Sequence, residues 1–279
     1  MGLVSRFISA PLSRWLKRPR LGRNIPLSDF ERIRHELKPG DVLLVEGRTR
    51  ISEVIKVVTQ SPWSHAALYV GRLHDIENEA VRAAVIHRSA FSPNTQLIIE
   101  SQLGTGTLVC ALTEYANHHL RICRPVGLSA DDAQTISAHA IKSLGRDYDV
   151  RQILDLARFL FPWGVLPRRW RSSLFRQRAG TETRTVCSTM IAEAFAAVEF
   201  PILPLVQRNE QGRVRLYRRN PKLCTPSDFD YSPYFEIIKY PFYDFTDNPG
   251  YKLLPWATDE VGAPADAAVG MSKGEGTDN

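Results

Sequence analysis

The sequence SPWSHAALYVG, Ser61 to Gly71, joins a turn-forming Ser-Pro pair to an apolar run that favours β-structure. His65 stands at the start of that run. A histidine in this position is either the first residue of a buried strand or a group held in place for proton transfer. The choice between the two depends on whether the rest of the chain supplies a nucleophile and a group that orients the imidazole.

Signals on either side of this stretch predict a domain of mixed helices and strands. Further strands are expected in DVLLVE (41–46), TQLIIES (95–101), GTLVCAL (106–112), HLRICRP (119–125) and YFEIIKY (234–240). Helices are expected over about 28–37, 51–60, 129–145 and 186–198, the first opened by a capping box of Ser28 and Glu31. The strands cluster and do not alternate strictly with long helices, which favours an α+β fold with an antiparallel sheet.

The excess positive charge belongs to one end of the chain. Six of the 36 basic residues precede the first acidic residue, Asp29, and the remaining 30 balance the 30 acidic ones. A formally neutral remainder argues against a protein-wide surface for nucleic acid, and we expect no nucleic-acid partner. No run of about 18 apolar residues occurs, so no segment is predicted to span a bilayer.

The two ends differ in composition from the predicted domain at 27–256. In the arm 1–26, apolar residues recur at near-helical spacing between cations, which resembles a helix lying on an anionic membrane through residues 1–24. Pro11 divides that pattern into two short pieces. An organelle transit peptide and a disordered basic tail are the alternatives. Residues 257–279 contain almost no large side chains and are predicted to be a disordered tail.

The four cysteines, Cys110, Cys123, Cys187 and Cys224, lie far apart in the sequence and form no CxxC pair. This spacing argues against a disulfide framework and against structural zinc, so we expect neither a metal nor a cofactor. It fits a reducing compartment, hence a cytoplasmic protein with possible peripheral attachment to the inner face of a membrane. Cys187 falls in the first turn of a predicted buried helix, where free N–H groups and the helix dipole stabilise a thiolate. A cysteine there can also be a small buried apolar residue.

Several motifs occur together in one order along the chain. These are KPGDVLLVEG, TQSPWSHAALYVG, LIIES, GRDYD, TVCSTMIAEAF and TPSDFDYSPYFEI. Together they resemble the YaeF/YiiX-type permuted papain-like amidases, a circularly permuted branch of the NlpC-like cysteine hydrolases related to lecithin:retinol acyltransferase. The resemblance implies a circularly permuted papain-like fold whose antiparallel sheet packs against helices, including the helix of the nucleophile. Permutation also explains why the histidine precedes the cysteine here.

The resemblance assigns expected roles to individual residues. It makes Cys187 the nucleophile, His65 its general base and Glu100 the group that orients the imidazole. Without the family, Glu100 reads as a strand-end carboxylate in solvent, and Gln102 is the first alternative orienter. Tyr148 is a further candidate for the cleft or the oxyanion, with packing as its alternative. Ser188 is the other candidate for the substrate or oxyanion, and it fits the helix start better than the chemistry.

This site implies attack on a carbonyl carbon and a thioester acyl-enzyme, with an amide, peptide or acyl-lipid as substrate. Water completes a hydrolase, whereas a second amine or hydroxyl makes an acyltransferase, and a membrane-attached binding module without turnover is the non-enzymatic alternative. A serine hydrolase is disfavoured because no G-x-S-x-G motif occurs. A metal hydrolase using His65, His74 and Glu100 lacks an HExxH motif or a paired-histidine helix.

Overall fold

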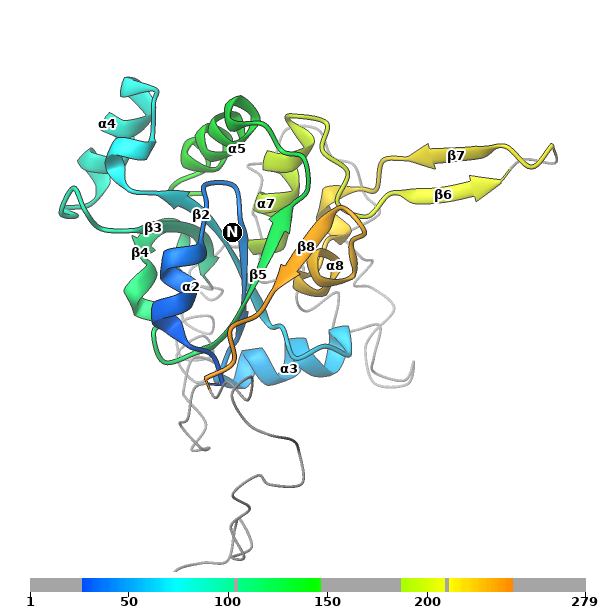
Figure 1. Ribbon diagram of the computed structural model, residues 1–279, viewed down its shortest axis with the longest axis horizontal. Coiled ribbons are helices and arrows are strands. Elements are labelled where there is room, and N and C mark those ends of the chain that lie inside the picture. The colour runs from blue at the N-terminus through cyan, green and yellow to red at the C-terminus, as the bar shows by residue number, and fades with distance from the viewer. Residues whose placement is uncertain (1–26, 103–104, 147–186, 209–210, 243–279) are drawn as a thin grey trace, which may run out of the picture. The chain divides into compact units, whose positions relative to one another are not determined.

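The computed structural model describes residues 27–102, 105–146, 187–208 and 211–242. Its largest sheet has six antiparallel strands in the order β4-β3-β2-β1-β5-β8 (Figure 1). An α+β fold with an antiparallel sheet is therefore confirmed. The strands are β1 Val42–Glu46, β2 His65–Gly71, β3 Leu97–Gln102, β4 Gly106–Ala111, β5 His119–Pro125 and β8 Phe235–Ile238.

The central strands β1 and β2 are buried along almost their whole length. Both read as continuous apolar runs because each face of the sheet is covered, so neither face needs polar side chains. Their register places Val45 opposite His65. His65 therefore sits at the edge of the sheet where β2 begins and β1 ends, as the sequence predicted for the start of this strand.

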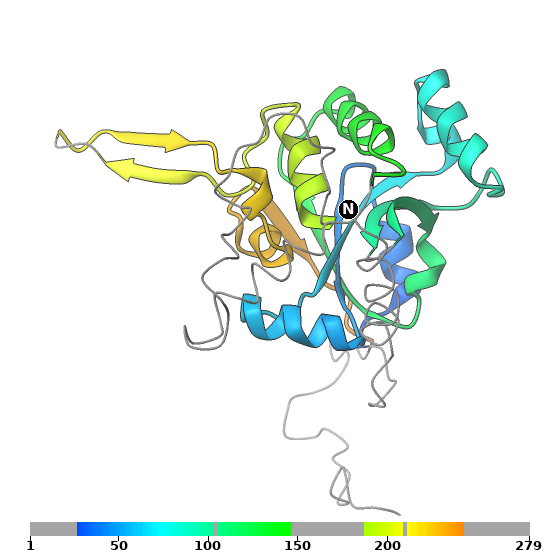
Figure 2. The same cartoon turned by 180° about the vertical axis from the view of Figure 1, so that it is seen from behind.

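Helices cover the two faces of the sheet. The face packed by α5 (Ala130–Lys142) and α7 (Cys187–Ala196) also receives α4 (Glu79–Arg88) and α8 (Pro226–Tyr231), and these elements share one hydrophobic core (Figure 2). A second core lies on the other face, beneath α2 (Phe30–Glu36). The helix α3 (Arg50–Thr59) connects β1 to β2. Short 3₁₀ turns complete this part of the chain: η1 Leu73–Asp75, η2 Leu112–Tyr115 and η4 Pro221–Leu223.

The predicted capping box of Ser28 and Glu31 is wrong. Asp29 caps α2, because its side chain accepts the N–H of Arg32 at 3.1 Å. Ser28 is buried and belongs to the sheet: its hydroxyl donates to the carbonyl of Leu120 at 3.0 Å and accepts the N–H of Leu120 at 2.9 Å. Residue 28 is held there because it forms a β-bridge with Pro241, which leaves the next residue to start the helix.

Two strands stand outside the main sheet. The strands β6 (Leu205–Arg208) and β7 (Val214–Tyr217) form an antiparallel hairpin that extends away from the six-stranded sheet (Figures 1 and 2). Neither this hairpin nor α4 was among the predicted elements. The predicted arm 1–26, Tyr148 and the tail 257–279 lie outside the described residues. Within the described ranges, no helix has both the length and the apolarity to cross a bilayer.

Candidate active site

Three side chains singled out from the sequence meet at one edge of the sheet. His65 is the first residue of β2, Glu100 lies near the end of the antiparallel neighbour β3, and Cys187 is the first residue of α7. Because β2 begins where β3 ends, the first two share this edge. Packing of α7 against β2 and β3 brings the start of the helix to the same place.

His65 contacts both of its partners. Its Nε2 atom is hydrogen bonded to Oε2 of Glu100, which has no exposed surface. An ionised carboxylate only accepts hydrogen bonds, so Nε2–H is the donor and Nδ1 is the ring nitrogen that remains for Cys187. The side chains of His65 and Cys187 lie close enough for each to shift the pKa of the other, and the side chain of Cys187 is also buried.

Glu100 is held by more donors than His65 alone. The hydroxyl of Tyr115 donates to the same oxygen as His65. The other oxygen, Oε1, accepts from Nε2 of Gln102 at 2.8 Å and from the thiol of Cys110 at 3.1 Å. A carboxylate without exposed surface is tolerable only when its lone pairs are satisfied in this way.

These contacts keep Glu100 ionised. Burial by itself would raise the pKa of the carboxyl group, but the charge of His65 and the hydrogen bonds from His65, Tyr115 and Cys110 outweigh it. The balance lowers the pKa of Glu100 to about 2. The buried carboxylate can therefore support a protonated imidazole at neutral pH.

Burial and nearby charges also have opposite effects on the pKa values of Cys187 and His65. Burial opposes the charged form of each, yet the two charges stabilise one another, and Glu100 adds to the effect on His65. The backbone N–H groups of Ala66 and Ser188 further stabilise the sulfur anion. As a result the pKa of Cys187 lies below its usual value and the pKa of His65 lies well above its own. The arrangement favours a thiolate beside an imidazolium, which is a nucleophile ready for attack.

The remaining predicted site residues do not all join this cluster. The hydroxyl of Ser188 donates to the carbonyl of Cys224 at 2.6 Å, so it ties the helix start to the loop before α8. Tyr148 lies outside the described residues. Gln102, the alternative orienter, is bonded to Glu100.

Two partners of Glu100 were missed. Cys110 is buried in β4, and its donation to a carboxylate was not foreseen. Strand alternation offered a weak signal, because Cys110 is two residues from Leu108, the register partner of Glu100 on β4. Tyr115 lies in the 3₁₀ turn η2 after that strand, and no local pattern marks it.

The geometry gives no support to the metal-hydrolase alternative. His74 lies in η1, beyond the far end of β2 from His65, and its Nε2 is 3.4 Å from Oδ1 of Asp75. Over the described ranges, no group of three or more His, Cys, Asp or Glu side chains is placed to hold a metal ion.

Residues 36–158 match the family described as permuted papain-like amidase enzyme, YaeF/YiiX, C92 family. The matched segment contains His65 and Glu100, and Cys187 lies beyond its end. A solved structure, the metalloprotein yiiX from Escherichia coli O157:H7, is similar at 15% identity over 73% of this chain and 97% of that chain, with a TM-score of 0.44. A comparison with curated proteins gives no match. The resemblance that the motifs indicated is thus confirmed: over residues 36–158 the chain matches the permuted papain-like amidases of the YaeF/YiiX type.

Proposed function

We propose that the protein is a cysteine-dependent hydrolase that cleaves amide bonds. Cys187 is the nucleophile, His65 is the general base and acid, and Glu100 orients the imidazole. One observation carries the proposal: His65 is hydrogen bonded to a fully buried carboxylate and also lies beside a cysteine at the first residue of a helix, close enough to lower the pKa of that thiol. The family match, which describes amidases, makes an amide or peptide the expected substrate class.

The chemistry follows from this arrangement. The thiolate of Cys187 attacks the carbonyl carbon, a carbon–sulfur bond forms and the carbonyl oxygen becomes an oxyanion. The N–H groups in the first turn of α7, which have no partner within the helix, would stabilise that charge. His65 then passes its proton to the leaving amine, the carbon–nitrogen bond breaks and a thioester remains. His65 next takes a proton from water, which attacks the thioester, and the acid is released as Cys187 is regenerated.

The acceptor of the acyl group defines a second possible outcome. If an amine or hydroxyl replaces water in the second half of the reaction, the same three residues act as an acyltransferase. We propose water as the acceptor, with amides and peptides ahead of acyl esters and acyl lipids. Attachment of the protein to an anionic membrane through residues 1–24 remains a proposal from the sequence alone.

Trapping the acyl-enzyme tests this function. The full chain is exposed to a cell extract of peptides and lipids, and intact-protein and peptide mass spectrometry locate any adduct. We expect an adduct on Cys187 that hydroxylamine removes, as it removes a thioester, and none in Cys187→Ala. Cys224→Ala is the matched control, because Cys224 is a second thiol near α7 and should be dispensable. A hydroxylamine-stable adduct, or labelling that persists in Cys187→Ala, would refute the proposal.

Release of the acyl group separates the alternatives. A hydrolase loses the adduct in buffer and incorporates one solvent oxygen from labelled water into the acid. An acyltransferase loses it only after an amine or alcohol is added. A non-catalytic binding module forms no thioester with any fraction of the extract.

A further inference from the structure

The hairpin formed by β6 and β7 exposes large apolar side chains to solvent. Leu205, Val206, Val214, Leu216 and Tyr217 are between 43% and 61% exposed. Every residue of both strands is exposed, and the strands pair only with one another among the described residues. An isolated two-stranded hairpin is marginally stable in water, so this one gains stability from whatever covers it.

The register distributes these side chains over both faces of the hairpin. Leu205 lies opposite Tyr217, and Val206 lies opposite Leu216. Side chains on a strand alternate between faces, so the first pair lies on one face and the second on the other, where Val214 joins it. A flat protein partner would cover one of these faces, whereas an interfacial lipid layer can surround both.

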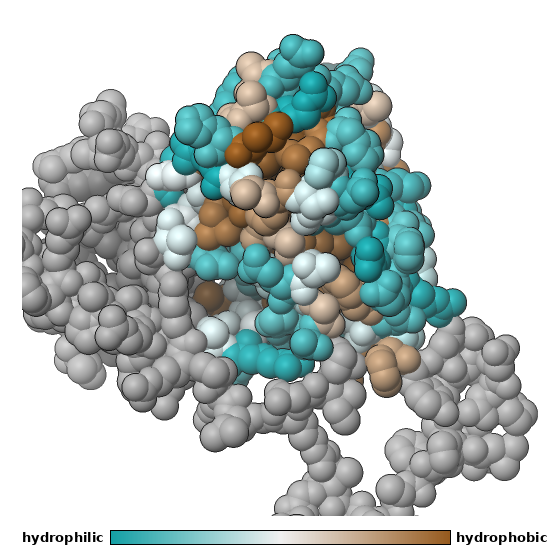
Figure 3. All heavy atoms as spheres, turned by 90° about the vertical axis from the view of Figure 1, so that its left-hand side faces the viewer, coloured by the Kyte–Doolittle hydropathy of each residue, from teal (hydrophilic) through white to brown (hydrophobic). Residues whose placement is uncertain are grey.

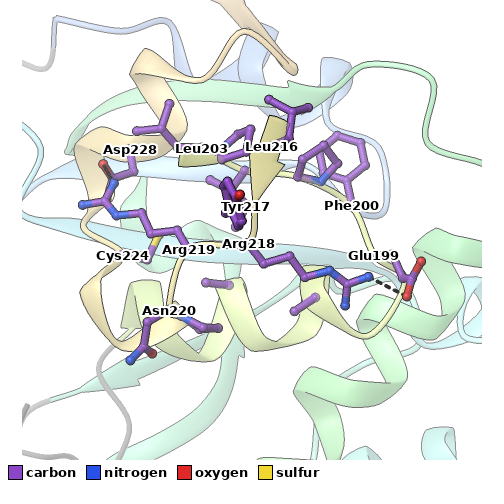
Figure 4. Close-up of a pocket in the computed structure, with 16 residues that line it drawn as sticks. Glu199, Phe200, Leu203, Leu216, Tyr217, Arg218, Arg219, Asn220, Cys224 and Asp228 are labelled. Atoms are coloured by element: carbon purple, nitrogen blue, oxygen red, sulfur yellow. Dashed lines mark hydrogen bonds and ion pairs between the residues drawn. The ribbon is translucent and has the colours of Figure 1, made fainter. Parts of the chain in front are cut away.

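The hairpin and its base carry a net positive charge. Residues 203–219 contain five arginines and one acidic residue, Glu210. Arg218 and Arg219 are paired at the base of the hairpin with Glu199 at 2.6 Å and Asp228 at 2.9 Å (Figure 4). The second pair is the less exposed one, and it ties the base to α8. Arg208 and Arg215 lie farther out, one on each strand and on opposite faces.

The base of the hairpin also borders a pocket of about 260 Å³. Leu216 and Tyr217 line it from the hairpin, with Phe200 and Leu203 from the loop after α7 (Figure 4). The apolar surface of the hairpin thus continues into the domain.

A different face of the protein, the side of α4 and the β4 edge, shows hydrophobic side chains framed by hydrophilic ones (Figure 3).

We propose that the β6–β7 hairpin binds the surface of an anionic lipid membrane, with its aliphatic side chains in the interface and its arginines at the lipid phosphates. Charge complementarity favours this occupant, because a second copy would bring two arginine-rich hairpins together. The two-sided apolar surface favours lipid over an acidic protein. Long arginine side chains suit this position, since their stems lie along apolar surface while the guanidinium reaches the headgroups.

Amide hydrogen exchange on the full chain tests the proposal segment by segment. It is measured with phosphatidylcholine vesicles, with vesicles that also contain phosphatidylserine, and without vesicles at two protein concentrations. We expect the amides of residues 205–217 to gain protection only with phosphatidylserine. This readout is independent of the arm 1–24, which is a separate segment, and of turnover.

Two variants sharpen the test. Val206→Ser with Leu216→Ser should abolish the protection and lower the partition of the full chain onto phosphatidylserine vesicles by about 10-fold. Arg208→Gln with Arg215→Gln keeps the apolar faces and should remove the preference for phosphatidylserine. Val126→Ser is the control, since Val126 is as exposed as Val206, at 61%, and lies outside the hairpin.

Three results would overturn the proposal. Unchanged exchange at 205–217 with every vesicle would show that the hairpin does not touch lipid. Protection that rises with protein concentration without vesicles would assign the surface to a second copy. Equal protection by neutral and anionic vesicles would remove the role of the arginines.

Discussion

Glu100 illustrates what a protein must supply to keep a charge in its interior. The carboxylate has no exposed surface, and a buried charge is strongly unfavourable unless it is paired and hydrogen bonded. Four donors converge on its two oxygens. Three of them come from other elements, and the fourth, Gln102, comes from the same strand as Glu100. This number of partners distinguishes a site from a strand-end carboxylate in solvent, the reading that the sequence alone would favour. The roles of Cys187, His65 and Glu100 remain proposals, which three substitutions test.

Glu100→Gln should lower turnover by roughly 10- to 1000-fold, less than Cys187→Ala does. The amide keeps the shape but loses the charge that stabilises imidazolium. Its NH₂ group also faces a donor that the carboxylate satisfied, so the free energy of unfolding should fall by about 1–3 kcal/mol. Steady-state kinetics and denaturant unfolding measure the two effects. Full activity in this variant would remove Glu100 from the site and leave a dyad of Cys187 and His65.

The reactivity of Cys187 should depend on His65. The lowered pKa of the thiol keeps part of it as thiolate at pH values below its usual 9.0. In His65→Ala the largest stabilising charge is gone and burial raises the pKa, so the thiolate fraction at neutral pH falls. We expect the rate of alkylation of Cys187 by iodoacetamide at neutral pH to drop by at least ~10-fold. The same rate in both proteins would show that the two side chains are not coupled in solution.

Tyr115→Phe removes a hydrogen-bond donor to Glu100 that the sequence did not indicate, and it should destabilise the protein. Glu100 titrates at a pKa of about 2 in the folded protein against 4.5 ordinarily, so its contacts contribute stability above pH 4.5 that is lost as the pH falls through about 2. Removing one donor raises the folded pKa toward 4.5 and should lower the free energy of unfolding by about 1.5–3 kcal/mol at neutral pH. The difference from the unchanged protein should shrink as the pH falls below 4.5.

Tyr240→Phe is the matched control for that measurement. The hydroxyl of Tyr240 donates to Glu36 at 3.1 Å, so it also contacts a carboxylate, but both residues are only half-buried, whereas Glu100 has no exposed surface. Its removal should change stability little. A loss for Tyr115→Phe that is no larger, or that stays constant down to low pH, would contradict the buried network.

At the level of helices and strands, the sequence predicted the elements whose signals lie within the element itself. The apolar runs of β1, β2 and β5 are long enough, and bounded clearly enough by turn residues, to be read directly from the sequence. The helix expected over 129–145 forms as α5, and Ser129 caps it by accepting the N–H of Asp132 at 3.1 Å. The same reasoning failed for α2, because the distant partner Pro241 holds Ser28 in the sheet. The hairpin was missed because its exposed strands mix arginines with apolar residues and show no regular alternation.

Substitutions at the start of α2 test the corrected cap. Asp29→Ala removes the acceptor for the N–H of Arg32 and should lower the free energy of unfolding by about 0.5–2 kcal/mol. Glu31→Ala should have almost no effect, since its ion pair with Arg34, at 3.4 Å, is exposed. Thermal or denaturant unfolding of the two variants decides between the caps. A larger loss for Glu31→Ala would restore the capping box of Ser28 and Glu31.

Considered as a whole, the molecule places its proposed chemistry where the start of β2, the end of β3 and the start of α7 come together. Glu100 belongs to the strand β3, whose residues Ile98 and Ile99 enter different cores, and Cys187 opens a helix buried in only one of them. His65 contacts both Glu100 and Cys187. No local sequence pattern encodes that meeting, because it depends on residues 35 and 122 positions apart in the chain. The family resemblance supplied it, which is why the three residues could be named together before the fold was known.

The arm at the start of the chain should act independently of this domain. Its apolar residues recur between cations, a pattern suited to an anionic surface rather than to a core. Deleting residues 1–24 should therefore leave the melting temperature nearly unchanged. It should weaken binding to phosphatidylserine vesicles, with the largest difference at low salt, where the charges of the arm are least screened. Vesicle flotation over a range of salt concentrations, beside calorimetry, measures both quantities. A large fall in melting temperature would show that the arm packs into the domain, and unchanged flotation would leave the β6–β7 hairpin as the proposed lipid contact.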